Sequence, residues 1–206
     1  MFDGILDINH NDNVDLAAAQ QGGIVAVIHK ATEGATYQDP LYATRRAQAK
    51  QLGLLWGAYH FGTGADVDQQ FANFVQTASP GPGDLVALDY ETNSGDPSNQ
   101  MTLAQAQQFV TQWQQQYGYL PLIYGSSLLT QAAQSSPTTI LGRCPLWIAQ
   151  YDAEITPSLP SIFSSFVLWQ YTDGTSPQPL LTAGVACDRS RFNGTQAQLT
   201  AAWPMA

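Results

Sequence analysis

The chain has 206 residues, a length that suits one domain, and its 44% hydrophobic content is enough for a substantial core and excludes a disordered chain. Only 11% of the residues are charged and the formal net charge is −9, so the surface would repel phosphate backbones and nucleic acid is not expected as a partner. No apolar run approaches the roughly 20 residues of a membrane span, so no membrane partner is expected, and a polar surface built from Gln, Asn, Ser and Thr favours a neutral ligand such as a sugar.

Short apolar runs alternate with helical patterns along the chain. The apolar runs predict eight strands, over residues 3–8, 23–31, 54–62, 85–91, 120–125, 144–151, 166–172 and 184–189. Helices are expected over residues 14–21, 39–53, 66–78, 102–118, 127–134 and 195–203. The clearest helix signals are an N-cap at Thr102, and Asp39, Pro40 and Gly53 as N-cap, first helical residue and C-cap of another helix.

The alternation of strands and helices predicts an α/β fold with a parallel sheet. Eight strands in one domain favour a (β/α)8-type barrel, near the short end of the roughly 200 to 400 residues of that fold. The last two connections are too short and too poor in helix signals for crossover helices, so an irregular barrel with reduced helices in its last third is expected. An open doubly wound sheet is the alternative. Without repeats or linkers, residues 1–206 are expected to form a single domain.

Residues able to do chemistry follow nearly every predicted strand. In a parallel barrel the active face lies at the carboxyl ends of the strands, so one rim should collect four acids, Asp7, Asp89, Glu91 and Asp188. The second strand brings Lys30 and Glu33 to this rim, and the surrounding residues should be Tyr59, Tyr124, Trp147, Gln150, Tyr151, Trp169 and Tyr171. Aromatic residues at strand ends more often cap a core, and a single Asp more often forms a turn. Four acids on one rim repel one another, however, which a purely structural barrel does not need.

Asp89 and Glu91 lie two residues apart at the end of the strand predicted over 85–91. Both side chains should therefore point to the same face, about 6.6 Å apart at the backbone, with Tyr90 pointing the other way. Two carboxylates at this spacing can flank a glycosidic bond, one keeping its proton as a general acid and the other stabilising a cationic intermediate. The negative charges of Asp7 and Asp188 would help to raise the pKa of the acid.

Other chemistries lack their sequence signatures. The chain has no H-E-x-x-H, no Cys/His cluster with zinc spacing, no G-x-S-x-G and no phosphate-binding G-x-x-x-x-G-K. No metal and no other cofactor is therefore expected. His29 lies in mid-strand and is expected to be structural, and of the neighbours Tyr59 and His60 only one can face inward.

Nine segments follow one another nearly from end to end: "GILDINH", "IHKATEG", "YQDP", "GAYHF", "LDYE", "PLIYG", "PLWIAQY", "LWQYTDG" and "CDRSRFNG". In this order they resemble the glycoside hydrolase family 25 lysozymes, the muramidases often called Chalaropsis-type lysozymes. The resemblance implies an irregular (β/α)-barrel that acts as a monomer on peptidoglycan glycan strands. The reaction it implies is cleavage of the β-1,4 bond between N-acetylmuramic acid and N-acetylglucosamine.

By position, the resemblance implies that Glu91 is the general acid and that Asp89 assists the 2-acetamido group of the substrate or stabilises the intermediate. Asp7 and Asp188 match the other two acids of the site. The candidate substrate-binding residues are Tyr59, Tyr124, Gln150 and Trp169, with Glu33 and Trp147 as further candidates. Asn9 and Tyr90 depart from the residues common in the family, and neither change removes a carboxylate.

The N-terminal segment "MFDGILDINH" lacks a basic region followed by a long apolar stretch, so no signal peptide is predicted. The resemblance implies action on the cell wall, in the periplasm or outside the cell, after holin-type release or delivery by dedicated machinery. Cys144 lies at the bottom of the predicted barrel and Cys187 at its top. A disulfide needs α-carbons within about 7 Å, so two free thiols are predicted.

Two other functions stay open. A catalytically inactive peptidoglycan- or chitin-binding protein on the same fold would bind walls without releasing reducing ends, and the presence of all four acids argues against it. A chitinase-like hydrolase would also use a Glu after its fourth strand. The D-x-x-D-x-D-x-E pattern expected there is absent, because Ala87 stands where an acid would be.

Overall fold

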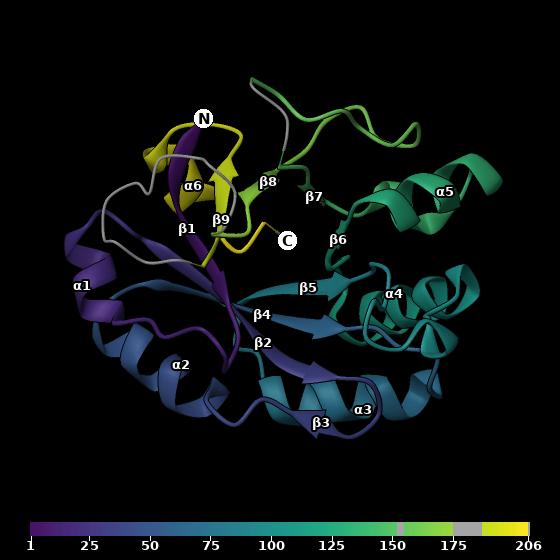
Figure 1. The fold of residues 1–206 in the computed structure, drawn as a ribbon, viewed down its shortest axis with the longest axis horizontal. Helices are drawn as coiled ribbons and strands as arrows, with labels where there is room; N and C mark the ends of the chain where they lie inside the picture. Colours follow the sequence, from purple (N-terminus) through teal and green to yellow (C-terminus); the bar gives the residue numbers. More distant parts are fainter. Residues whose placement is uncertain (152–154, 175–186, 206) are drawn as a thin grey trace.

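A computed structural model describes residues 1–151, 155–174 and 187–205, in which eight strands close into a barrel (Figure 1). The barrel strands are β1 (Phe2–Ile8), β2 (Ala26–Glu33), β4 (Leu55–Phe61), β5 (Leu85–Asp89), β6 (Leu122–Gly125), β7 (Leu146–Ala149), β8 (Leu168–Thr172) and β9 (Asp188–Phe192). They are arranged in the order β1-β9-β8-β7-β6-β5-β4-β2, and pairing of β1 with β2 closes the barrel. The two-residue β3 (Tyr37–Gln38) pairs antiparallel with the end of β2. The sequence-based prediction of an irregular α/β barrel is therefore confirmed.

The last barrel strand differs from the prediction in both position and direction. β9 begins at Asp188 rather than at residue 184, and residues 184–186 lie outside the described residues. It pairs antiparallel with both β8 and β1, whereas all other pairs of neighbouring barrel strands are parallel. An antiparallel neighbour needs no crossover helix, so β8 ends and β9 begins at the same rim. Asp188 thus reaches the carboxyl-end rim from the first residue of a strand rather than the last.

Helices cover the barrel unevenly. They are α1 (Leu16–Gln21), α2 (Tyr42–Gln51), α3 (Val67–Ala78), α4 (Leu103–Tyr117), α5 (Ser127–Ser135) and α6 (Gln196–Ala202), with short 3-10 helices at Pro97–Asn99 and Ile140–Arg143. Figure 1 shows α1 to α4 following one another around the outside of β2, β4 and β5. Residues 155–167, before β8, contain no helix. Across the described residues, no helix is both long enough and apolar enough to cross a membrane.

The caps show why these helices begin and end where they do. Thr102 and Gln105 form a reciprocal capping box at the start of α4, and Gly118 ends the helix with a φ of 82°. The helix expected from residue 39 begins later, at Tyr42. The Asp39 carboxylate accepts a hydrogen bond from the Leu41 N–H (2.9 Å). This bond stabilises a turn that precedes the helix.

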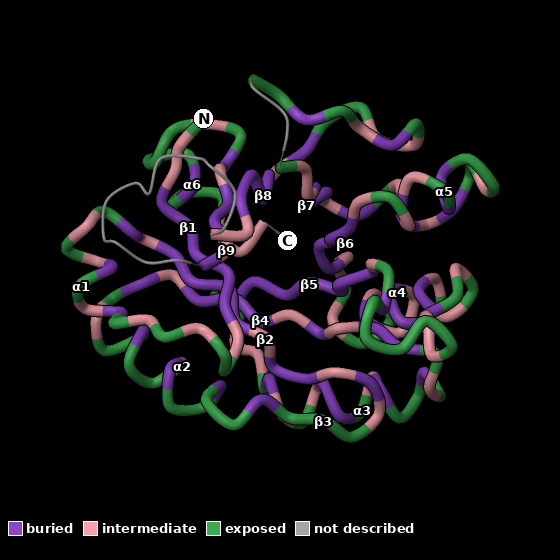
Figure 2. Tube along the Cα trace, in the orientation of Figure 1, coloured by how far each residue is buried: buried purple, intermediate pink, exposed green. Residues whose placement is uncertain are grey.

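Side chains on each strand alternate between the barrel interior and the outer layer beneath the helices. On β5, Leu85 and Ala87 belong to the interior cluster, whereas Val86 and Leu88 pack in the outer cluster. Buried residues consequently follow the strands, while the exposed ones lie on the outer faces of the helices (Figure 2). The inward-facing residue nearest the carboxyl-end rim of each strand therefore faces the opening of the barrel at that rim.

Cys144 and Cys187 are both buried free thiols, which confirms the prediction from the strand assignment. Burial raises the pKa of the Cys144 thiol to about 12. The same cause raises the pKa of Cys187, and the nearby Asp7 carboxylate raises it further. Neither thiol is poised to form a thiolate nucleophile at neutral pH.

Candidate active site

A pocket with an open volume of about 260 Å³ lies at the carboxyl ends of the barrel strands. Its lining comes from seven strands and one loop, namely Asp7, Tyr59, Asp89, Glu91, Tyr124, Trp147, Gln170 and Asp188. All four predicted acids and three of the predicted aromatic residues are thus brought together. The strand residues among them continue the inward rows of the interior, so the alternation that fills the core also builds the pocket.

Asp89 is the last residue of β5 and extends the inward row of Leu85 and Ala87. The strand ends there, so Glu91 lies in the following loop and not on the strand predicted to reach residue 91. Its backbone oxygen accepts a hydrogen bond from Gln100 Nε2 (2.9 Å), which fixes the loop over the pocket. Between the two acids, Tyr90 points outward as predicted and is buried in the outer cluster.

Electrostatics favour a proton on the Asp89–Glu91 pair. Burial raises the pKa of Asp89 well above its ordinary range, and the charge of Glu91 raises it further. Burial also raises the pKa of Glu91, while Lys30 lowers the pKa of both acids. Asp89 Oδ1 is buried and has no hydrogen-bond partner among the described residues. The pair therefore titrates as a unit, and one oxygen is left to accept a donor from a ligand.

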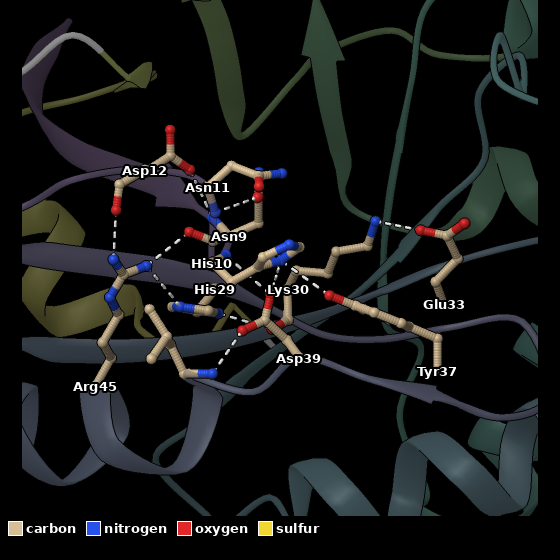
Figure 3. A network of polar contacts seen from close by, with 11 residues as sticks. Asn9, His10, Asn11, Asp12, His29, Lys30, Glu33, Tyr37, Asp39 and Arg45 are labelled. Atoms are coloured by element: carbon tan, nitrogen blue, oxygen red, sulfur yellow. Dashed lines mark hydrogen bonds and ion pairs between the residues drawn. The ribbon is translucent and has the colours of Figure 1, made fainter.

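Lys30 lies within β2 near this pair, and three groups contact its ammonium. Its ammonium forms an ion pair with Glu33 and lies 4.8 Å from the ring centre of Phe61 and 5.8 Å from that of Tyr37. Figure 3 shows Lys30 reaching toward Glu33, next to the cluster around His10 and Asp39. Glu33, a predicted site residue, does not line the pocket. It forms an ion pair with Lys30, the cation near the two acids.

Asp7 and Asp188 face each other across β1 and β9, where they are register partners. Gln170 Nε2 donates to Asp7 Oδ1 (2.8 Å) and to Asp188 Oδ2 (3.2 Å). Burial, followed by the charge of Asp188, raises the pKa of Asp7 well above its ordinary range. Burial, followed by the charge of Asp12, raises the pKa of Asp188 to about 7. Two acids thus share a partly dehydrated space in which both cannot easily ionise.

Gln170 is a pocket residue that the sequence analysis did not single out. It lies two residues after Leu168, in the inward row of β8, and is almost completely buried. Its neighbour Trp169, which the sequence pointed to instead, takes the outward direction. Trp169 is fully buried in the outer cluster, away from the pocket, and its Nε1 donates to the Gln150 carbonyl oxygen (2.7 Å).

The aromatic residues form one wall of the pocket. Tyr124 packs against Trp147 with ring centres 4.7 Å apart, and Tyr59 meets the same indole edge-on at 6.5 Å. Trp147 Nε1 donates to Ser190 Oγ (2.9 Å), which fixes the indole plane. Burial raises the pKa of both tyrosines, so their hydroxyl groups stay protonated at neutral pH.

A second hollow lies beside the pocket, lined by Ser126, Ala149, Gln150 and Tyr151. The Gln150 side chain accepts a hydrogen bond from the Ser158 N–H (2.7 Å) and does not line the acid pocket. The lining of both hollows offers hydroxyl, amide and aromatic groups. Within the described ranges, no group of three or more His, Cys, Asp or Glu residues is arranged to hold a metal ion. The lining of the two hollows suits a neutral polyhydroxyl ligand that lies across both of them and contacts a protonated carboxyl group.

Known proteins are similar to this chain in sequence and in fold. The sequence model of the glycosyl hydrolases family 25 matches residues 6–178. Lysozyme M1 of Streptomyces globisporus is 25% identical over 95% of this chain and 69% of its own length, and the autolytic lysozyme of Clostridium acetobutylicum is 30% identical over 80% and 48%. The structure of a muramidase from Acremonium alcalophilum superimposes with a TM-score of 0.77 at 29% identity, covering 98% of both chains.

Proposed function

Because the chain belongs to the glycosyl hydrolases family 25 and is a glycoside hydrolase of the lysozyme type, we propose that it cleaves peptidoglycan in the cell wall. The bond is the β-1,4 link between N-acetylmuramic acid and N-acetylglucosamine, and Glu91 is the general acid. The observation that carries the assignment is the joint placement of Asp89 and Glu91 in one pocket with an aromatic wall.

Glu91 donates the proton to the glycosidic oxygen. A general acid must hold its proton near neutral pH, and burial supports this by raising the pKa of Glu91. Glu91 lies in a loop above the end of β5 and is less buried than Asp89, which places it nearer to a sugar chain crossing the opening. Protonation of the leaving oxygen then allows the bond to the anomeric carbon to break.

Asp89, the second acid of the pair, assists the 2-acetamido group of the substrate. Its Oδ1 lacks a donor and can accept the N–H of the 2-acetamido group, whose carbonyl oxygen then attacks the anomeric carbon to give an oxazolinium ion. A hydrogen bond from the substrate favours the charged form of Asp89. The shared proton is thereby left on Glu91, so binding of the correct sugar sets the protonation state that the reaction needs.

The remaining predicted residues act around this pair. Tyr59, Tyr124 and Trp147 form the wall against which a sugar ring stacks. Gln150 extends the groove into the neighbouring hollow, and Trp169 acts indirectly by holding the Gln150 backbone. Glu33 acts through its ion pair with Lys30.

Mass spectrometry of digested peptidoglycan tests the bond that is cleaved. We expect purified cell walls treated with the protein to yield fragments whose new reducing end is N-acetylmuramic acid. A new reducing end on N-acetylglucosamine would show that the other glycosidic bond is cleaved. Wall binding without any new reducing end would instead support the inactive binding protein.

Replacing Lys30 by Met is expected to extend activity to higher pH. Lys30 opposes the effect of burial and lowers the pKa of Asp89 and Glu91, so its removal raises both values and keeps the acid protonated further into the alkaline range. The measurement is the pH profile of turbidity loss from cell walls. Lys50→Met is the control, since Lys50 pairs with Asp84 (3.0 Å) outside the pocket and should leave the profile unchanged. A limit that moves to lower pH in Lys30→Met would contradict this role.

A further inference from the structure

Gln170 joins four parts of the pocket through one side-chain amide. Its Nε2 donates to Asp7 on β1 (2.8 Å) and to Asp188 on β9 (3.2 Å). Its Oε1 accepts from the hydroxyl groups of Tyr124 on β6 (2.8 Å) and Tyr151 after β7 (2.7 Å). Both N–H groups and both lone pairs of the amide are used, so the orientation of the amide is fixed by its partners.

The fixed orientation decides which polar groups remain for a ligand. The hydroxyl protons of Tyr124 and Tyr151 both point to Gln170 Oε1, so their oxygens keep lone pairs rather than protons for a sugar. The N–H of Trp147 is likewise committed, to Ser190. This side of the pocket therefore offers acceptors to the hydroxyl and amide N–H groups of a saccharide.

The same amide works against the repulsion between the two acids on β1 and β9. Each N–H favours the charged form of the carboxyl group that it contacts. A Glu at this position would place a third carboxyl group between Asp7 and Asp188. The titratable groups that line the pocket at this position or act on its two acids are Asp7, Asp12, Tyr59, Asp89, Glu91, Tyr124, Tyr151, Asp173 and Asp188.

We propose that Gln170 is a positioning residue of the hydrolytic site, which holds Asp7 and Asp188 side by side and turns the hydroxyl protons of Tyr124 and Tyr151 away from the substrate. The saccharide-binding half of this inference rests on the proposed function. The arrangement of the acids and tyrosines rests on the hydrogen bonds alone, so it can be tested without substrate.

Two substitutions separate the polarity of the amide from its bulk. Gln170→Met keeps the volume and removes all four hydrogen bonds. Gln170→Glu keeps the shape, and a protonated Glu still accepts from the tyrosines and donates to one acid. The matched control is Gln70→Met, which removes another fully buried amide, one that donates to the Thr63 and Ala65 carbonyl oxygens and lies outside the pocket.

The primary measurement is a ¹³C NMR titration of the Asp carboxyl groups. In Gln170→Met we expect Asp7 and Asp188 to titrate at higher pH than in the wild type, whereas Gln70→Met should leave both titrations unchanged. On purified cell walls, Gln170→Met should lower kcat by about tenfold or more, the size expected for losing a hydrogen bond to a charged group. Gln170→Glu should recover activity only on the acid side of the wild-type profile.

Unchanged titrations in Gln170→Met would overturn the proposal, as would equal shifts in Gln70→Met or full activity of Gln170→Glu at pH 8. If Gln170→Met does not fold, Gln170→Glu still tests it, because the acid-side recovery requires a protonated carboxyl at this position. If the titrations shift as expected but the wild type releases no reducing ends, the proposed function fails and the assigned role in orienting the acids stands.

Discussion

Glu91→Gln is expected to lower kcat on purified cell walls by about 100- to 10,000-fold, the range that a positioned general acid contributes. Gln has the shape of Glu but no proton of suitable acidity for the glycosidic oxygen. The loop should keep its position, because the Gln100 bond goes to the backbone oxygen of residue 91. Turbidity loss of cell walls measures the rate, and a thermal melt shows that the variant is folded.

Asp68→Asn is the matched control for this substitution. Asp68 Oδ1 accepts a hydrogen bond from Gln108 between α3 and α4, outside the acid pocket, so its change to an amide should leave wall hydrolysis unaffected. Because Glu91 acts on the leaving group, the loss in Glu91→Gln should also be smaller for a substrate with a good aryl leaving group. Wild-type turnover of cell walls by a folded Glu91→Gln protein would rule out Glu91 as the acid.

Period-two alternation explains how much of the pocket could be predicted. On β1 and β5 an acid stands near the end of the apolar run, so Asp7 and Asp89 could be placed on the rim from sequence alone. The same rule correctly sent Tyr90 outward. For Tyr59 and His60 it required one to face inward, and the structure selects Tyr59.

On β8, alternation does not show which residues face the pocket, and the predicted sugar-binding residue was Trp169 and not Gln170. The sequence "LWQYT" is buried on both faces, so hydrophobicity does not distinguish the row that faces the interior from the row beneath the helices. A large aromatic residue is the more familiar sugar platform, and the polar residue between two aromatics was passed over. The interior row of Leu168 and Gln170 emerges only once the barrel is closed.

The direction of β9 could not be predicted either, because strand pairing is a tertiary property. A short apolar run before Asp188 resembled another parallel strand that ends at the rim. In the structure the strand starts at Asp188 and runs down between β8 and β1. The position of Asp188 on the rim was predicted correctly although the direction of its strand was not. The end of a parallel strand and the start of an antiparallel strand lie at the same rim.

Asp7→Asn is expected to stabilise the fold at alkaline pH, by about 2 kcal/mol, a typical cost of a poorly satisfied buried polar group. For a domain of this size that corresponds to a rise in Tm of about 4–8 °C. Asn retains the acceptor for Gln170 and cannot carry the charge that burial and Asp188 disfavour. Thermal melts from pH 4 to pH 9 measure the difference from the wild type.

The sign of the pH dependence follows from the raised pKa of Asp7. Its ordinary value of 3.8 applies to the unfolded chain, and its value in the folded chain is well above this. The stability that the protonated group contributes is complete below the unfolded value and is lost as the pH rises through the folded one. Wild type and Asp7→Asn should therefore have similar Tm values near pH 4 and diverge as the pH rises.

Asp84→Asn provides a contrast with the opposite sign. Burial acts to raise the pKa of Asp84, but hydrogen bonds from Gly81, Lys50 and Arg46 overcome this and lower it. Asp84 therefore contributes stability above its unfolded pKa and loses it as the pH falls through the folded value, so Asp84→Asn should be less stable than the wild type at neutral pH. If Asp7→Asn were also less stable than the wild type at pH 8, the charged form of Asp7 would stabilise the fold. The four acids on the rim would then carry no electrostatic cost, and that cost is what indicates a functional site.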